Sequence, residues 1–148
     1  TPNMRLLEKY AVKCGGGTNH RIGLYDMVML KDNHVDFAGG IEQAIDRTRH
    51  YLAANGKALK IEIEVRNLEE LERVMQHGGV DRIMLDNFDI PTLRKAVERI
   101  GGKYETEASG GITDATLRPY AETGVDFISV GALTHHIKSL DLSLVSNF

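Results

Sequence analysis

Five strand-like segments alternate with helical segments along this chain, and this alternation restricts its fold more than any other feature. Apolar or alternating runs typical of strands cover residues 27–30, 59–65, 82–87, 104–108 and 126–130. Apolar residues at helical spacing cover residues 4–13, 41–54, 68–77, 91–100 and 113–123. Strands joined through a helix run parallel, because the helix carries the chain back along the sheet. The pattern therefore predicts an α/β fold with a parallel sheet and helical crossovers.

Missing nucleotide-binding motifs and the chain length indicate which kind of α/β fold to expect. The sequence contains no GxGxxG and no Walker motif, so it lacks the signature of a Rossmann or P-loop nucleotide fold. A (β/α) barrel fits better, but a full barrel has eight units and typically ~250 residues. We therefore expect an incomplete barrel with about five βα units, formed by residues 1–148 as one partial domain.

Local signals mark where the predicted helices begin and end. Asn67, with Glu70 three residues later, matches a capping box, and Pro91 suits the first turn of a helix. The glycine run at 15–17 follows the first helix. It is either a helix stop or a place where backbone amides approach an anion closely.

Composition excludes several classes of protein. A net charge of −3, with the basic residues dispersed among acids, leaves no footprint for nucleic acid. No apolar run approaches the ~20 residues of a membrane span, and nothing resembles a signal peptide. The single cysteine, Cys14, excludes an internal disulfide and indicates a cytoplasmic protein. Without a nearby base, it is expected to be a small packed side chain rather than a nucleophile.

Two cationic residues flank the first strand. Arg21 precedes the apolar run at 27–30, and Lys31 follows it. Lysine is rarely buried unless a counter-charge or an anionic ligand meets it. Lys31 stands where α/β folds gather ligand-binding groups, at the carboxyl end of a strand. The alternative is that it merely extends to water.

The other strands also end in polar or glycine-rich signals. These are Glu64, Asp86-Asn87, Ser109-Gly110-Gly111 and, after the fifth strand, Gly131-Ala132. Carboxyl ends of parallel strands meet at one edge, so we expect a site there. Arg21 and Lys31 would bind anions and His20 could donate a hydrogen bond. Glu64 and Asp86 would face a cation or sugar hydroxyls, and the glycine loops would bind phosphate.

The remaining candidates have plainer interpretations. Glu62 lies deeper than Glu64 on the same strand and is interpreted as a structural, paired carboxylate. The histidines at 34, 50 and 77 are interpreted as surface or cap residues. His135 and His136 are adjacent, so they point apart and make a poor metal site.

Taken together, the motifs resemble one enzyme family. GGG-x-x-HR, KDNH, IEIEV, LDN, EASGGI and GVDFISVGALTH occur in this order from Thr1 to about Leu144. They look like quinolinate phosphoribosyltransferase (nicotinate-nucleotide pyrophosphorylase, carboxylating). That family converts quinolinate and phosphoribosyl pyrophosphate, with Mg²⁺, to nicotinate mononucleotide, pyrophosphate and CO₂ in NAD biosynthesis.

The resemblance implies a role for each candidate residue. Arg21 and Lys31 hold the carboxylates of quinolinate, with His20 beside them. Glu64 and Asp86 face the ribose and a Mg²⁺ held through substrate and water, and act with Lys31 in catalysis. Phosphate is bound by the two glycine loops, formed by Ser109, Gly110, Gly111, Gly131 and Ala132.

The resemblance also has gaps. Family members carry a basic strand just before the position of Thr1 and an N-terminal domain that supplies an arginine across a dimer interface. This sequence would then be the C-terminal portion of the barrel, inactive alone, from a homodimer or higher homo-oligomer. Asn3 replaces a usual glycine, a change that a turn tolerates. Two alternatives stay open: a ModD-like paralogue with another substrate, and a non-catalytic phosphate-binding domain.

Overall fold

The computed structural model describes residues 2–136, 142 and 144, which fall into two compact units. One unit is His20–Val130. The other is drawn from Thr1–Asn19 and Gly131–Phe148.

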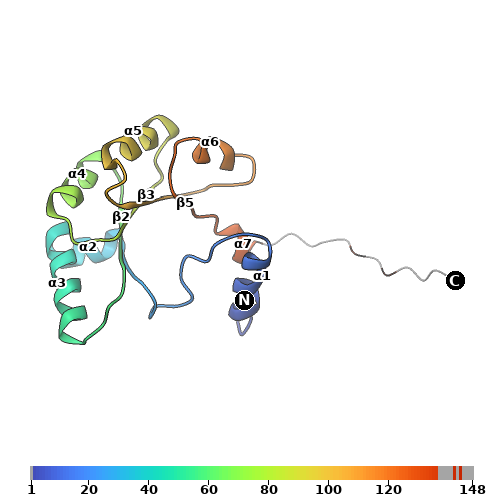
Figure 1. Cartoon of the computed structure of the whole chain (residues 1–148), viewed down its shortest axis with the longest axis horizontal. Helices are drawn as coiled ribbons and strands as arrows, with labels where there is room; N and C mark the ends of the chain where they lie inside the picture. Colours follow the sequence, from blue (N-terminus) through green and yellow to red (C-terminus); the bar gives the residue numbers. More distant parts are fainter. Residues whose placement is uncertain (1, 137–141, 143, 145–148) are drawn as a thin grey trace. The chain divides into compact units, whose positions relative to one another are not determined.

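The unit His20–Val130 is built on a five-stranded parallel sheet (Figure 1). Its strands are β1 (Val28–Leu30), β2 (Ile61–Val65), β3 (Arg82–Asp86), β4 (Glu105–Ser109) and β5 (Phe127–Ile128). They lie in the sheet in their chain order. Consecutive order is the arrangement of a (β/α) barrel, whereas a doubly wound sheet reverses direction part-way. The predicted partial barrel is confirmed.

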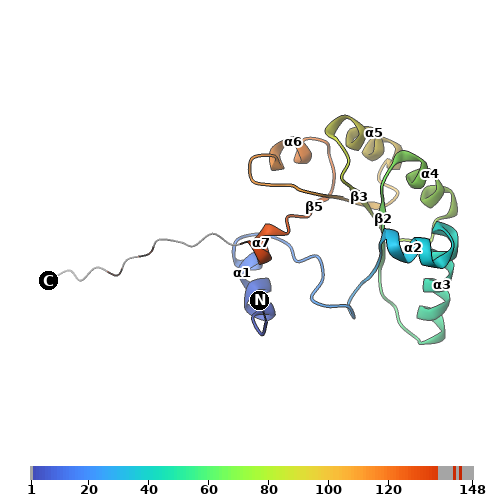
Figure 2. The same cartoon turned by 180° about the vertical axis from the view of Figure 1, so that it is seen from behind.

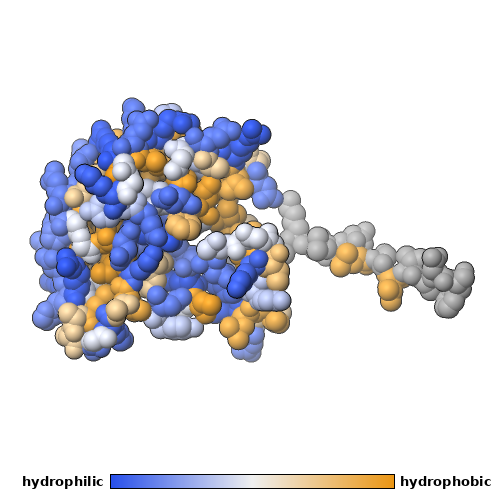
Figure 3. Space-filling view, in the orientation of Figure 1, coloured by the Kyte–Doolittle hydropathy of each residue, from blue (hydrophilic) through white to orange (hydrophobic). Residues whose placement is uncertain are grey.

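Helices pack on one face of this sheet, as both views show (Figures 1 and 2). They are α2 (Asp32–Ala38), α3 (Ile41–Ala54), α4 (Leu68–His77), α5 (Ile90–Ile100) and α6 (Leu117–Ala121). Ile63 and Leu85 of the sheet are fully buried in the same core as Leu71 and Leu93 of the helices. The outward faces of α4 and α5 are hydrophilic (Figure 3). This helix-facing layer is the hydrophobic core of the unit.

The opposite face of the sheet carries polar side chains, because strand residues alternate between faces. Strand register places together on this face Met29, Glu62, Glu64, Arg82, Met84, Asp86, Glu105, Glu107 and Ser109. In a closed barrel this face would be the interior. The sequence-predicted site residues on the strands therefore share one face.

The predicted cap of α4 is confirmed with one difference. The Asn67 side chain accepts hydrogen bonds from the backbone N–H of Glu69 (3.0 Å) and of Glu70 (2.9 Å). The Glu70 carboxylate accepts from the backbone N–H of Arg66 at 2.8 Å. In a capping box it would accept from that of Asn67. The helix start is as expected, but the reciprocal bond lies one residue earlier.

Two helical predictions need correction. The helix expected over 113–123 is confined to α6, Leu117–Ala121. The N–H of Thr113 donates to the Thr116 hydroxyl at 2.9 Å, and such side-chain bonds compete with helix formation. The short helix α2 was not predicted. It begins directly after β1, with the Lys31 N–H donating to Nδ1 of His34 at 2.9 Å.

In the other unit, α1 (Arg5–Cys14) carries the expected helix. Asn3 before it has φ 62°, a left-handed conformation in which glycine is favoured and asparagine tolerated. The expected turn is thus confirmed. Cys14 is exposed at the helix end, so the expectation of a packed cysteine is wrong. No residue of α1 is buried, and hence its apolar spacing did not indicate core packing.

The glycine run after α1 is a helix stop. The backbone N–H groups of Gly15, Gly16 and Gly17 donate to the carbonyls of Ala11, Lys13 and Val12, at 3.0, 3.1 and 2.9 Å. A Cβ on Gly17 would lie 2.9 Å from Cγ1 of Val12, so close packing also requires glycine there. Amides already bonded to carbonyls cannot bind an anion without breaking these bonds. The anion-binding alternative is therefore not favoured.

The second helix of this unit is α7 (Ala132–His135). The predicted tail from His135 onward lies largely outside the described residues. Among the helices that the structure describes, none has the length and apolar content needed to cross a membrane.

Candidate active site

Lys31 and Glu64 meet at the carboxyl edge of the sheet. Leu30 of β1 pairs with Ile63 of β2, so that the next residues of the two strands lie side by side. Lys31 Nζ lies 4.0 Å from Glu64 Oε2, and the two side chains are 52% and 12% exposed. The ammonium group therefore reaches water and a carboxylate at once. This position agrees with the interpretation of Lys31 as a lysine that reaches water, and its role as a site residue stays a prediction.

Glu64 lies in an environment that disfavours its charged form. Burial, and then the nearby Asp86 carboxylate, raise the pKa of Glu64, whereas the Lys31 ammonium opposes the increase. A carboxylate that is desolvated and faces a second carboxylate is poised to accept a cation. Asp86 thus lies near enough to Glu64 for its charge to act on it, and their joint role in a site stays a prediction.

The two acidic residues are not direct cross-strand neighbours. Glu64 pairs with Met84, and Asp86 pairs with Ser109 of β4. Asp86 thus lies two residues further along its strand than the partner of Glu64. The Cα atoms of Glu64 and Asp86 are therefore further apart than the ~4.8 Å between adjacent strands.

The Ser109-Gly110-Gly111 loop packs against Asn87. The N–H of Asn87 donates to the Ser109 carbonyl at 2.9 Å, and the Asn87 amide donates to Asp86 Oδ2 at 2.6 Å. A Cβ on Gly110 would lie 2.2 Å from Oδ1 of Asn87, and Gly110 has φ +106°. Gly110 is therefore required by its contact with Asn87. Phosphate binding by this loop stays a prediction.

Arg21 is held on the loop before β1. Its Nη1 donates to the Met27 carbonyl at 3.5 Å, and the side chain is half-buried. The Asp26 carboxylate accepts from the N–H groups of Ile22 and Gly23 at 2.7 and 3.0 Å, which closes the loop. These bonds lower the pKa of Asp26. Sequence reasoning missed Asp26, although an aspartate that caps backbone N–H groups is a common loop signal.

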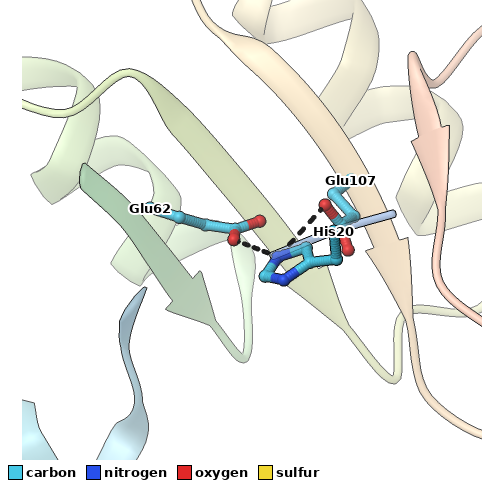
Figure 4. Close-up of side chains that lie close together, drawn as sticks. All are labelled: His20, Glu62 and Glu107. Carbon is cyan, nitrogen blue, oxygen red and sulfur yellow. Dashed lines mark hydrogen bonds and ion pairs between the residues drawn. The ribbon is translucent and has the colours of Figure 1, made fainter. Parts of the chain in front are cut away.

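His20 lies over the polar face of the sheet, between two carboxylates (Figure 4). Its Nε2 is 2.5 Å from Glu62 Oε2 and 3.6 Å from Glu107 Oε2. Glu62 is 0% exposed and Glu107 2%. The interpretation of Glu62 as a paired carboxylate is confirmed, and its partner is the predicted site residue His20.

Arg82 neutralises this buried acidic cluster. Its Nη1 donates to Glu107 at 2.8 Å, and its Nε and Nη2 donate to Glu105 at 3.1 and 3.0 Å. Burial by itself would lower the pKa of Arg82, but the bonds to both glutamates raise it. Burial and the charge of Glu62 raise the pKa of Glu107, which also accepts a bond from the Ser129 hydroxyl. Sequence reasoning missed Glu107, although the alternation of Glu105, Glu107 and Ser109 placed it on the site face.

Two groups of side chains could be considered for a metal ion. His20, Glu62 and Glu107 offer ligand atoms within 4.8 Å of one another. Their close atoms are already hydrogen-bonded, to each other or to Arg82, and a metal would have to displace these bonds. Glu64 and Asp86 offer carboxylate oxygens, the donors that Mg²⁺ prefers. We therefore favour this pair, with the ion held through substrate and water.

The other candidates divide between the two units. Gly131 and Ala132 belong to the unit of α1 and α7, so their phosphate role stays a prediction. His34 caps α2 and His77 pairs with Asp46 at 2.9 Å, while His50 is exposed, as expected for surface and cap histidines. The rings of His135 and His136 contact each other, with centroids 4.5 Å apart, so the expectation that they point apart is wrong.

Comparisons with known proteins match nearly the whole length of the chain. The family model described as "Quinolinate phosphoribosyl transferase, C-terminal domain" matches residues 1–145. A protein of Oryza sativa subsp. japonica named "Nicotinate-nucleotide pyrophosphorylase [carboxylating], chloroplastic" is 47% identical over 157 residues. The match covers 97% of this chain and 42% of that protein. The "Probable nicotinate-nucleotide pyrophosphorylase [carboxylating]" of Bacillus subtilis (strain 168) is 46% identical, with 97% and 48% covered.

Solved structures give the same result. The nicotinate-nucleotide pyrophosphorylase from Francisella tularensis superimposes with a TM-score of 0.89 at 45% identity, over 97% of this chain and 49% of that one. The chain thus spans about half the length of the relatives that it matches.

Proposed function

Because this chain belongs to the quinolinate phosphoribosyl transferase C-terminal domain family, we propose that the complete protein transfers phosphoribosyl from phosphoribosyl pyrophosphate to quinolinate. The ring nitrogen of quinolinate forms a bond to the anomeric carbon as the bond to pyrophosphate breaks. The 2-carboxylate then leaves as CO₂, and a proton takes its place, which gives nicotinate mononucleotide. The observation that carries the proposal is the edge where Lys31 lies 4.0 Å from Glu64. It combines a cation for a dicarboxylate with an acidic group for a phosphosugar.

Lys31 and Arg21 are proposed to bind the quinolinate carboxylates. Lys31 reaches water from the sheet edge, so an anion can approach its ammonium group. Arg21 is positioned by a loop that Asp26 closes, and a guanidinium can bind a carboxylate through two parallel hydrogen bonds. His20, bound to Glu62 through one ring nitrogen, is proposed to contact the same substrate.

Glu64 and Asp86 are proposed to face the ribose. The anomeric carbon gains positive charge as the bond to pyrophosphate breaks, and carboxylates nearby stabilise that charge. A Mg²⁺ bound with the pyrophosphate would neutralise the leaving group. The raised pKa of Glu64 and the closeness of Asp86 fit such a cation. We propose that neither residue is a covalent nucleophile.

Ser109, Gly110 and Gly111, with Gly131 and Ala132, are proposed to bind the 5′-phosphate through backbone N–H groups. The positive φ of Gly110 and Gly111, +106° and +60°, turns the backbone sharply after β4. The further proposals from family membership are a cytoplasmic homodimer or higher homo-oligomer, with its active site at the subunit interface.

Product analysis tests the proposed reaction. The complete protein that carries this chain is incubated with Mg²⁺, quinolinate and phosphoribosyl pyrophosphate, and CO₂ and nicotinate mononucleotide are quantified. We expect equal amounts of both products, and none when either substrate is omitted. Binding of phosphoribosyl pyrophosphate without quinolinate binding, measured by calorimetry, would contradict the proposal and favour another substrate or a non-catalytic domain.

The 148-residue chain alone is expected to release no CO₂. Its site has the strand-end groups described above, but the residues that the structure describes form five strands, whereas a closed barrel has eight. Turnover comparable to that of the complete protein would contradict this expectation.

A further inference from the structure

Two buried carboxylates approach one nitrogen of His20 from different strands. Glu62 comes from β2 and Glu107 from β4, with β3 between them (Figure 4). Both contacts are made to Nε2, at 2.5 and 3.6 Å. In the part of the chain that the structure describes, no hydrogen bond is made to Nδ1, and the His20 side chain is 23% exposed. Nε2 of the ring is thus bound by the two glutamates, and Nδ1 can donate a hydrogen bond to another group or accept one from it.

The two glutamates are not equivalent. Glu107 is bonded to the Arg82 guanidinium at 2.8 Å and to the Ser129 hydroxyl, so its burial is compensated without His20. Glu62 has His20 as its hydrogen-bond partner, and among the described residues no donor reaches its buried Oε1. A buried ion pair is weak grounds for stability, because desolvation offsets the attraction. Glu62 is therefore better explained by what it does to His20 than by what it adds to the core.

We infer that Glu62, together with Glu107, is a positioning residue that holds Nε2 of His20 and thereby presents Nδ1 to an anionic group of the substrate. This inference rests on the proposed function and assigns the group as a carboxylate of quinolinate. When Nε2 donates to Glu62, Nδ1 can also donate only if the ring carries both protons. A ring with both protons would offer an N–H donor at Nδ1 to an anion, and the Glu62 carboxylate would balance its charge. Arg82 faces the same carboxylates from β3 and keeps the cluster from carrying excess negative charge.

A double-mutant cycle in the complete protein tests the inference. Quinolinate affinity is measured by calorimetry for the wild type and for Glu62→Gln, Glu62→Leu, His20→Ala and the double variant Glu62→Leu/His20→Ala. Glutamine keeps an acceptor for Nε2, whereas leucine removes it. We expect Glu62→Leu to weaken binding about tenfold and Glu62→Gln to weaken it less. In the His20→Ala background, Glu62→Leu should change the affinity less than about twofold.

Glu105→Gln is the matched control. Glu105 lies on β4 beside Glu107 and shares Arg82, but it does not contact His20. It should leave quinolinate affinity unchanged. Side-chain ¹⁵N spectra recorded without substrate provide a readout independent of activity. The His20 nitrogen signals should shift in Glu62→Leu and stay in place in Glu105→Gln.

The outcomes separate the inference from the proposed function. Equal affinities for Glu62→Leu and the wild type, additive losses in the cycle, or unshifted His20 signals would overturn the positioning role while the proposed function stands. Failure of the wild type to bind quinolinate would overturn the proposed function and, with it, the substrate contact of Nδ1.

Discussion

The Lys31 ammonium lies 4.0 Å from the Glu64 carboxylate at the edge where β1 and β2 end. This pair combines the two kinds of charge that the proposed reaction requires. It also connects the residue assigned to quinolinate with one of the two assigned to the ribose, so each can be changed and read out separately.

Lys31→Ala should weaken quinolinate binding far more than binding of phosphoribosyl pyrophosphate. Removal of one partner of a charge pair leaves the substrate carboxylate unpaired. Because the lysine is half exposed, we expect about 2 kcal/mol, or ~30-fold in Kd, the low end for such truncations. Calorimetry with each substrate checks the result, and equal losses for both would show that Lys31 is wrongly assigned.

Glu64→Gln and Asp86→Asn should lower turnover and raise the Mg²⁺ concentration needed for half-maximal rate. Each change removes a negative charge from the region of the cation without altering side-chain size. Asp46→Asn is the control, since Asp46 pairs with His77 on the helical surface. Mass spectrometry should find no ribosyl ester on either residue. An ester, or wild-type turnover of both variants at limiting Mg²⁺, would refute the assignment.

Glu64 should also make stability depend on pH. Its pKa is raised in the folded chain above the usual 4.5, so the folded state binds a proton more tightly than the unfolded state. The wild type therefore loses stability from this group as the pH rises from about 4.5 through the raised pKa. The Glu64→Gln variant has no group that titrates at this position, so it does not lose stability in this way. Urea unfolding without substrate should show the variant gaining stability relative to the wild type as pH increases, and the opposite trend would contradict the raised pKa.

Gly110→Ala should destabilise the protein more than Gly111→Ala. A Cβ at Gly110 would lie 2.2 Å from Asn87 Oδ1 and 2.9 Å from its backbone nitrogen, in a backbone conformation with φ +106°. At Gly111 the φ is +60° and nothing lies within 4 Å, so a side chain meets only the left-handed backbone cost. We expect about 1–3 kcal/mol more for Gly110→Ala, measured by urea unfolding. Equal effects would mean that Asn87 moves freely away.

Much of the site could be read from the sequence because strand ends follow from local pattern. Once the strands are parallel and consecutive, Lys31, Glu64, Asp86 and Ser109 must reach the same edge. The position of each along that edge depends on register, which is set by pairing between strands that are far apart in the sequence, such as Val28 with Ile61 and Asp86 with Ser109. Register placed Asp86 opposite Ser109 and not beside Glu64.

The sequence by itself determined the alternation of strands and helices, the Asn67 cap and the helix stop at residues 15–17. These features depend on neighbours within a few positions. Tertiary structure alone decided that His20 meets Glu62, 42 positions away, and that Asn87 requires glycine at position 110. It also decided that Cys14 is exposed. Such outcomes depend on which distant surfaces come together, and a side chain's chemistry does not specify its partner until the chain has folded.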